Sequence, residues 1–252
     1  MFMQKDKLSV KVYTTCEEMG KAAAIDVENK IKELLEEKEF INMIFAAAPS
    51  QTAFLGELIA RDGIEWPRIN AFHMDEYIGL PQDAPQGFGN FLKRHLFDSV
   101  PFCQVFYMEG SAPADKECER YATLLVDYPP DIVCLGIGEN GHIAFNDPHV
   151  ADFNDPLYIK VVSLDEICRQ QQVNDKCFAR IEEVPTHALT LTVPALVLAP
   201  YMYCVVPFNS KAQAVYNTIQ GEISENCPAS ILRTKQDAIL YLDKDSSALL
   251  DI

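Results

Sequence analysis

The sequence lacks three features that would place it in a membrane or outside the cell. No run of 18 apolar residues occurs, so no segment is long enough to span a bilayer as a helix. The N-terminus, Met-Phe-Met-Gln-Lys-Asp-Lys, has no apolar stretch of the kind found in signal peptides. The eight cysteines include no Cys-x-x-Cys pair, and in a chain without a leader they indicate reduced thiols. We therefore expect a cytoplasmic protein.

Positive charge is also scarce. Lysine and arginine number 21 against 37 aspartates and glutamates, which gives a formal net charge of −16. Nucleic acids and anionic membranes are bound through basic patches, so neither is an expected partner. A small phosphorylated ligand remains compatible with this charge, because one or two local cations and backbone N–H groups suffice to bind it.

The chain shows no boundary between domains. No linker rich in Ser, Gly or Pro, no block of like charges and no internal repeat interrupts it. Hydrophobic residues make up 48% and charged residues 23%, which is typical of a globular protein. We therefore expect residues 1–252 to form a single domain with a substantial core.

Apolar runs and amphipathic stretches alternate along most of the chain. Strands are predicted at 8–13, 40–48, 68–73, 105–108, 132–135, 157–164 and 201–206. Helices are predicted between them at 15–35, 54–59, 86–97, 114–127, after Asp165 and at 214–219, with Thr15 and Glu18 forming a capping box. Such alternation implies right-handed crossovers. The fold class is therefore α/β, a doubly wound, mostly parallel, Rossmann-like sheet with helices on both faces.

The most informative stretch follows the predicted strand 132–135 and reads Gly-Ile-Gly-Glu-Asn-Gly-His-Ile-Ala-Phe-Asn-Asp-Pro. Its first six residues match the dinucleotide-binding pattern G-x-G-x-x-G, which requires a helix to open at the third glycine. Pro148 and Pro156 follow too soon for such a helix, so NAD is not an expected cofactor. The glycines instead permit a tight turn that carries a titratable imidazole, His142.

Polar side chains follow four of the predicted strands. In a parallel sheet these strand ends face one edge, where ligands bind. Each group taken alone has an ordinary interpretation as a helix cap or a solvated strand end, but together they supply anion binders and acid-base groups for a sugar phosphate. The four groups are Ser50/Thr52, Asp75/Glu76, Asn140/His142/Asp147 and Ser210/Lys211.

Two of these motifs resemble the glucosamine-6-phosphate deaminase/isomerase family, whose superfamily includes the 6-phosphogluconolactonases. The segments are Phe-His-Met-Asp-Glu-Tyr-Ile-Gly-Leu at 72–80 and the glycine turn at 136–148. Ile-Ala-Phe-Asn after Gly-His is similar to the deaminases, whereas lactonases typically continue Thr-Ala-Ser. The resemblance implies an enzyme that opens an amino-sugar 6-phosphate ring, moves a proton between C2 and C1, and releases ammonia without a cofactor or metal. A homo-oligomer is a possible assembly.

The resemblance also assigns roles to residues. His142 is expected to exchange a proton with the ring oxygen, since histidine titrates near neutral pH. Asp75 is expected to move the C2 proton, with Asn140 and Asp147 completing the catalytic group. The remaining assignments are phosphate binding by Ser50, Thr52, Arg169 and Lys211, and substrate contact by Glu76 and Gly138.

The sequence departs from the family pattern at two catalytic positions. Asn140 stands where deaminases usually have Asp, and Asp147 where they usually have Glu. We expect the amide of Asn140 to accept the ring N–H of His142 and so fix its tautomer, and the shorter Asp147 to need a backbone shift to reach the same point. The turn at Ser50 also lacks the family's paired glycines. The galactosamine-6-phosphate isomerase branch shares Asn-Gly-His, so gluco and galacto substrates, lactone hydrolysis and sugar-phosphate binding without catalysis all remain open.

Overall fold

The core of the molecule is a sheet whose strands are apolar on both sides. The computed structural model describes residues 1–251. Its larger sheet has eight strands in the order β1-β2-β11-β10-β7-β3-β4-β6. Every neighbouring pair is parallel except β1 with β2 at one edge. The strands are β1 (Phe2–Lys5), β2 (Leu8–Val12), β3 (Ile41–Phe45), β4 (Ile69–His73), β6 (Gln104–Phe106), β7 (Ile132–Leu135), β10 (Tyr201–Val206) and β11 (Ala238–Leu242).

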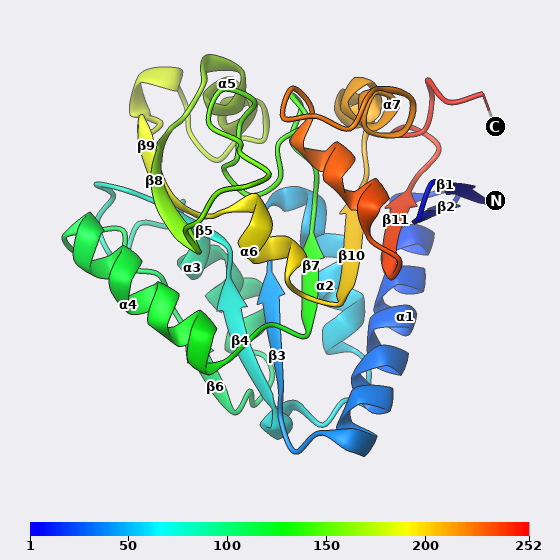
Figure 1. Ribbon diagram of the computed structural model, residues 1–252, viewed down its shortest axis with the longest axis horizontal. Coiled ribbons are helices and arrows are strands. Elements are labelled where there is room, and N and C mark those ends of the chain that lie inside the picture. The colour runs from blue at the N-terminus through cyan, green and yellow to red at the C-terminus, as the bar shows by residue number, and fades with distance from the viewer. Residues whose placement is uncertain (252) are drawn as a thin grey trace.

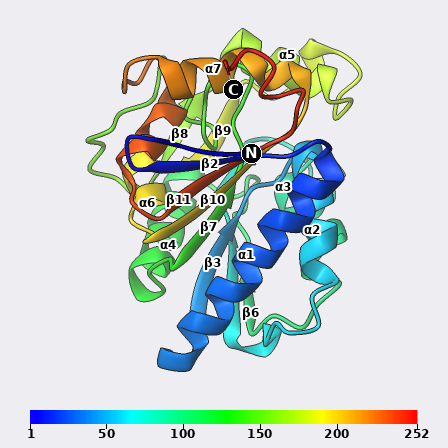
Figure 2. The ribbon, with the colours of Figure 1, turned by 90° about the vertical axis from the view of Figure 1, so that its right-hand side faces the viewer.

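Helices cover both faces of this sheet, as expected for buried parallel strands. In β10, Tyr203 and Val205 pack into one hydrophobic cluster, and Met202, Cys204 and Val206 pack into the other. This alternation follows from the two-residue period of a strand. Figure 2 shows the sheet edge-on between the two helical layers. The prediction of a doubly wound α/β fold is confirmed.

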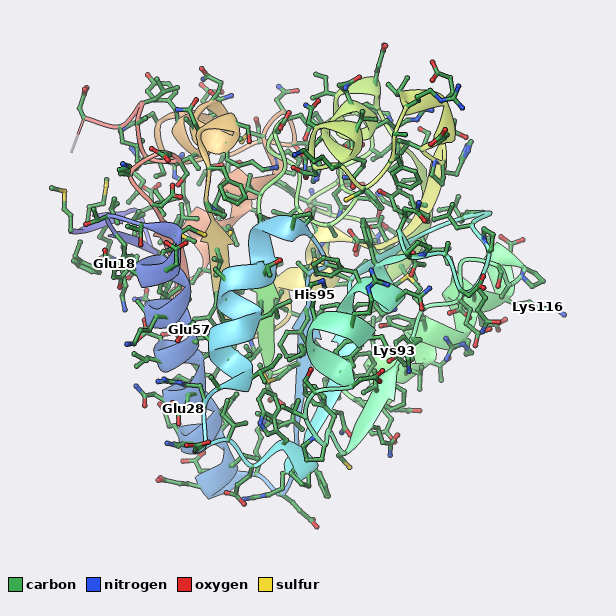
Figure 3. All side chains as sticks on the ribbon, turned by 180° about the vertical axis from the view of Figure 1, so that it is seen from behind. Glu18, Glu28, Glu57, Lys93, His95 and Lys116 are labelled. Carbon is green, nitrogen blue, oxygen red and sulfur yellow. The ribbon has the colours of Figure 1, made fainter. Side chains whose placement is uncertain are left out.

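One layer consists of α1 (Cys16–Glu37), α2 (Thr52–Ile59) and α3 (Phe88–Leu92). Thr15 caps α1 as predicted, since its hydroxyl accepts the N–H of Glu18 at 3.2 Å. In Figure 3 Glu18 lies at the exposed start of α1 and Glu57 on α2, while Glu28 on α1 forms ion pairs with Lys32 and Arg61. The predicted helix 86–97 is α3 followed by a π-helical segment, Lys93–Phe97.

The opposite face carries α4 (Ala114–Asp127), α6 (Val193–Val197) and a second, three-stranded sheet (Figure 1). This sheet pairs β5 (Asp75–Tyr77), β9 (His187–Leu191) and β8 (Ile159–Ser163) in antiparallel fashion. The strand predicted at 157–164 therefore exists, but it lies outside the parallel sheet. After β9 ends at Leu191, Pro194 stands in the first turn of α6, where a proline is well accommodated.

Two further helices lie above the carboxyl ends of the parallel strands (Figure 1). They are α5 (Glu166–Asn174), which Asp165 caps as predicted, and α7 (Ala212–Gln220). No helix in residues 1–251 combines the length and apolar character needed to cross a membrane. The layers pack as one α/β unit, with the edge beneath α5 and α7 left to hold polar groups.

Candidate active site

Four neighbouring strands deliver the predicted site residues to one edge. In the sheet β10, β7, β3 and β4 are adjacent in that order. Lys211 follows β10, His142 follows β7, Ser50 follows β3 and Asp75 follows β4. The grouping inferred from the sequence is thus a consequence of strand order.

These residues line one small, mostly buried pocket of about 60 Å³. Five of the predicted residues are among its walls: Ser50, Asp75, Gly138, His142 and Lys211. Ligand pockets commonly measure about 300–1,000 Å³, so this space alone does not hold a hexose phosphate. A neighbouring cavity of about 390 Å³ shares Ala47, Ala48, Phe88 and Gln172 with it. The two cavities together have the size that a sugar phosphate needs.

His142 sits on the floor of the pocket, with its ring against the backbone of Gly138. A β-carbon at position 138 would lie 2.2 Å from Cε1 of that ring, so only glycine leaves room for it. Nδ1 of His142 lies 3.0 Å from Oδ1 of Asp147, although the two atoms are not aligned as a hydrogen bond. With Nδ1 beside this carboxylate, Nε2 is the nitrogen left for a substrate.

Asp147 is fully buried behind His142. Burial favours its neutral form, but the contacts with His142 and Asn140 and the N–H of Asp165 outweigh burial, so the pKa of Asp147 lies below its ordinary value. The carboxylate is therefore ionised at neutral pH and lies beside the imidazole of His142. Asp147 reaches the ring despite being one methylene shorter than Glu.

Asn140 makes a different contact from the one expected. Its Oδ1 accepts the backbone N–H of His142 at 3.1 Å, and no hydrogen bond joins it to the imidazole. Its Nδ2 donates to Oδ1 of Asp147 and to Oδ2 of Asp165, both at 2.9 Å. The expectation that the amide fixes the ring tautomer directly is wrong, because the side chain turns toward two carboxylates that need its donors.

Asp75 presents an unpartnered carboxylate to the pocket. The residue is 7% exposed, and within residues 1–251 no hydrogen bond or ion pair reaches its side-chain oxygens. Burial, followed by the charge of Glu76, raises the pKa of Asp75 well above its ordinary value. A buried carboxylate with a raised pKa and free lone pairs is suited to accept a proton.

Lys211 supplies a cation without a counter-ion. It is 3% exposed, and its ammonium forms no salt bridge or hydrogen bond in the described part of the chain. Burial lowers the pKa of Lys211. Lys211 immediately precedes α7, and Ser50 lies in the turn before α2, so two helix N-termini are close to the pocket. Their N–H groups and dipoles favour an anion.

Besides Asn140 and Asp147, which lie behind His142, three predicted residues are absent from the pocket walls. Thr52 is exposed at the start of α2. The carboxylate of Glu76 faces a separate cavity across β5 and accepts the N–H groups of Tyr77, Phe88 and Gly89. Arg169 donates to the carbonyls of Ile181 and Val184, which secures the loop after α5. Glu76 is absent from the pocket because adjacent residues of a strand point to opposite sides. Arg169 is absent because its guanidinium is used by the loop carbonyls.

Three glutamines in the pocket wall were not predicted. Gln51 donates to the carbonyl of Val205 at 3.0 Å, and Gly136 leaves space for its amide. Gln171 accepts the N–H of Glu139, and Gln172 lies beside it on α5. The run of three glutamines at 170–172 is a sequence signal for Gln171 and Gln172, but not for Gln51.

His142, Asp147 and Cys168 place possible metal-binding atoms within 4.8 Å of one another. Both oxygens of Asp147 already accept hydrogen bonds, from Asn140 and from the backbone of Asp165. A metal ion would have to displace these donors, so the cluster is better described as a hydrogen-bonded network.

Comparison with known proteins assigns the chain to a family. The model of the family described as glucosamine-6-phosphate isomerases/6-phosphogluconolactonase matches residues 14–241. A glucosamine-6-phosphate deaminase of Bacillus cereus (strain B4264) is 33% identical over 243 residues, covering 96% of this chain and 89% of the relative. Another, from Bacillus cereus (strain G9842), is 34% identical over 220 residues, covering 87% of this chain and 82% of the relative.

Solved structures agree with this assignment. A monomeric glucosamine-6-phosphate deaminase has a TM-score of 0.87 at 29% identity, covering 98% of this chain and 100% of that one. A 6-phosphogluconolactonase from Thermotoga maritima has a TM-score of 0.77 at 21% identity, covering 94% of this chain and 100% of that one, and it shares the fold. This chain therefore belongs to the family of glucosamine-6-phosphate isomerases and 6-phosphogluconolactonases.

Proposed function

We propose that this protein converts an amino-sugar 6-phosphate, either glucosamine 6-phosphate or its galacto epimer, to the ketose 6-phosphate and ammonia. The observation that carries the proposal is the presence of two unpartnered groups in one buried pocket, the carboxylate of Asp75 and the ammonium of Lys211. Relatives named glucosamine-6-phosphate deaminase, 33% identical over 96% of the chain, support it.

The substrate's phosphate is bound at one end of the pocket. Lys211 supplies the charge, Ser50 supplies a hydroxyl, and the N-termini of α2 and α7 supply backbone N–H groups. The attraction between the ammonium of Lys211 and the phosphate dianion offsets the free energy that burial of this ammonium costs. Thr52 and Arg169 have no part in this step.

Ring opening and proton transfer take place at the other end. Nε2 of His142 mediates transfer of the anomeric hydroxyl proton to the ring oxygen as the bond between C1 and that oxygen breaks. Asp75 then takes the proton from C2 and returns it to C1, which turns C2 into an iminium carbon. Water adds to C2 and ammonia leaves, so the net reaction consumes one water and releases one ammonia. The raised pKa of Asp75 brings this base nearer to neutral pH, where proton transfer in both directions is efficient.

Lactone hydrolysis is the related alternative, because it uses the same phosphate-binding end. It moves no proton at C2, however, and so gives no role to the unpartnered carboxylate of Asp75. Ammonia release from both amino-sugar phosphates and hydrolysis of 6-phosphogluconolactone are measured on one preparation. Ammonia release is expected, and lactone hydrolysis without it would refute the proposal.

The matched variant is Asp75→Asn, which keeps the shape of the side chain and removes the proton acceptor. Turnover should fall by about 10²–10⁴-fold while KM changes by less than about threefold, since the phosphate contacts are untouched. A protein that binds sugar phosphates without catalysis would instead be stabilised by both ligands against heat and show no turnover in either form.

A further inference from the structure

Asn140 separates two carboxylates that would otherwise face each other. Its two amide hydrogens are both used, one by Oδ1 of Asp147 and one by Oδ2 of Asp165, each at 2.9 Å. Its oxygen is directed to the backbone N–H of His142. This is the one orientation of the amide that satisfies all three neighbours, because carboxylates accept hydrogen bonds and the backbone N–H donates one.

Asp165 is bound to the same network at three points. Its backbone N–H donates to Oδ2 of Asp147 at 3.1 Å, and its Oδ2 accepts the amide of Asn140. Its Oδ1 accepts the N–H of Cys168 at 2.6 Å and so caps α5. The start of α5 therefore holds both oxygens of Asp147, one through the backbone of Asp165 and one through Asn140.

The network also fixes α5 relative to the glycine turn. A second contact joins the two segments six residues after Asp165, where Gln171 accepts the N–H of Glu139 at 2.9 Å. Gln171 and Gln172, both on α5, line the pocket. The hydrogen bonds that orient Asp147 therefore also position these two glutamines. A carboxylate at position 140 would have no hydrogen to donate and would meet two anions at hydrogen-bonding distance.

We propose that Asp165 is a positioning residue that holds Asp147 beneath His142 through Asn140, and that residues 140 and 165 are matched as amide and carboxylate. The inference deepens the proposed deaminase function and rests on it for the kinetic part of its test. It predicts that an aspartate at position 140 damages this particular chain, because Asp165 is already present.

The test uses four variants of the full chain. Asp165→Ser keeps a side chain that caps α5 but is too short to reach Asn140. Asn140→Asp adds the third carboxylate, and a double variant combines both substitutions. Thr15→Ala removes the cap of α1, far from the pocket, and serves as the matched control for the loss of a helix cap.

The kinetic prediction is that Asp165→Ser lowers kcat in the wild-type protein but raises it in the Asn140→Asp variant. Asp165→Ser should lower kcat about tenfold with KM within about threefold, since a displaced acid-base group slows the chemistry and leaves phosphate binding intact. Asn140→Asp should lower kcat about 100-fold. Adding Asp165→Ser to Asn140→Asp should restore about tenfold, because it removes one of the three carboxylates. Thr15→Ala should leave kcat unchanged. Independent, multiplicative effects of the two substitutions would overturn the inference.

A second readout does not depend on the proposed function. The ¹⁵N signal of Nδ1 of His142, assigned by its loss in His142→Gln, is recorded without substrate. Its chemical shift should change in Asp165→Ser and stay the same in Thr15→Ala. If the wild-type protein releases no ammonia, the proposed function fails, and this signal alone decides the inference. An unmoved signal in Asp165→Ser overturns it in either case.

Discussion

The imidazole of His142 lies against the α-carbon of Gly138, and the fit leaves no room for a methyl group. A β-carbon at position 138 would lie 2.2 Å from Cε1, 2.3 Å from Nε2 and 2.4 Å from Nδ1 of the ring. Glycine is required here for space. Its φ is not in the left-handed region, so alanine would be compatible with the backbone and would act on the ring alone.

Gly138→Ala should therefore lower kcat about 100-fold, because a displacement of about 1 Å at a reacting group has an effect of that size. The folded structure should persist, as judged by circular dichroism. The control is Gly56→Ala, where no atom lies within 4 Å of the new methyl group and the residue is inside α2. The control should keep full activity and gain up to about 1 kcal/mol of stability. Full activity of Gly138→Ala would contradict the assigned role of His142.

The pKa of Asp75 predicts how stability changes with pH. A carboxyl whose pKa is raised by folding binds its proton more tightly in the folded state than in the unfolded chain. Its contribution to stability is complete below the ordinary value of 3.8 and is lost as pH rises through the raised value. Asp75 therefore destabilises the fold at neutral pH, where the unfolded chain has already ionised this group.

Asp75→Asn should consequently raise Tm at pH 7 and change it little at pH 4. The same variant should lower turnover, so stability and activity are predicted to move in opposite directions. Thermal unfolding of both proteins across this pH range makes the comparison, with Asp83→Asn as an exposed control for the loss of one charge. A Tm difference that does not vary with pH would show that Asp75 titrates at its ordinary value.

Arg169 provides a test of the corrected phosphate site. Its guanidinium donates three hydrogen bonds to the carbonyls of Ile181 and Val184. Arg169→Ala should lower the free energy of unfolding by about 1–3 kcal/mol, because it leaves these carbonyls without their donor. KM for the sugar phosphate, measured well below Tm, should change by less than about threefold. A KM increase of more than tenfold would return Arg169 to the phosphate site.

The strand-end residues were predictable because periodicity identifies buried strands and parallel strands share one polar edge. Ser50, Asp75, His142 and Lys211 were located in this way. Glu76 was misassigned because adjacent residues of a strand point to opposite sides, and whether β5 is a strand depends on its pairing with β9, which lies more than 100 residues away.

The role of Asn140 was likewise beyond reach of the local sequence. Its amide donates to Asp165, which is 25 residues further along the chain. The sequence predicts Asp165 only as the cap of α5. The family pattern suggested a loss of function at position 140, whereas the network gives the amide two acceptors and a reason to be there. Contacts between distant loops are set by tertiary packing. The sequence can therefore predict single residues such as Asn140 and Asp165, but not that they contact each other.

Lys211 gives the last prediction, since its buried charge has no partner before substrate binds. Burial lowers the pKa of Lys211, so the folded state binds this proton less tightly than the unfolded chain does. The resulting loss of stability is complete below the lowered pKa and disappears as pH rises through the ordinary value of 10.5. Inorganic phosphate should stabilise the wild-type protein, and Lys211→Met should therefore raise Tm at pH 7 and abolish that stabilisation. Lys116→Met, on the exposed surface of α4 in Figure 3, serves as the control and should keep that stabilisation. If Lys211→Met retained the response to phosphate, the ammonium of Lys211 would not be the group that binds the anion, and the pocket would have to bind it through helix N-termini alone.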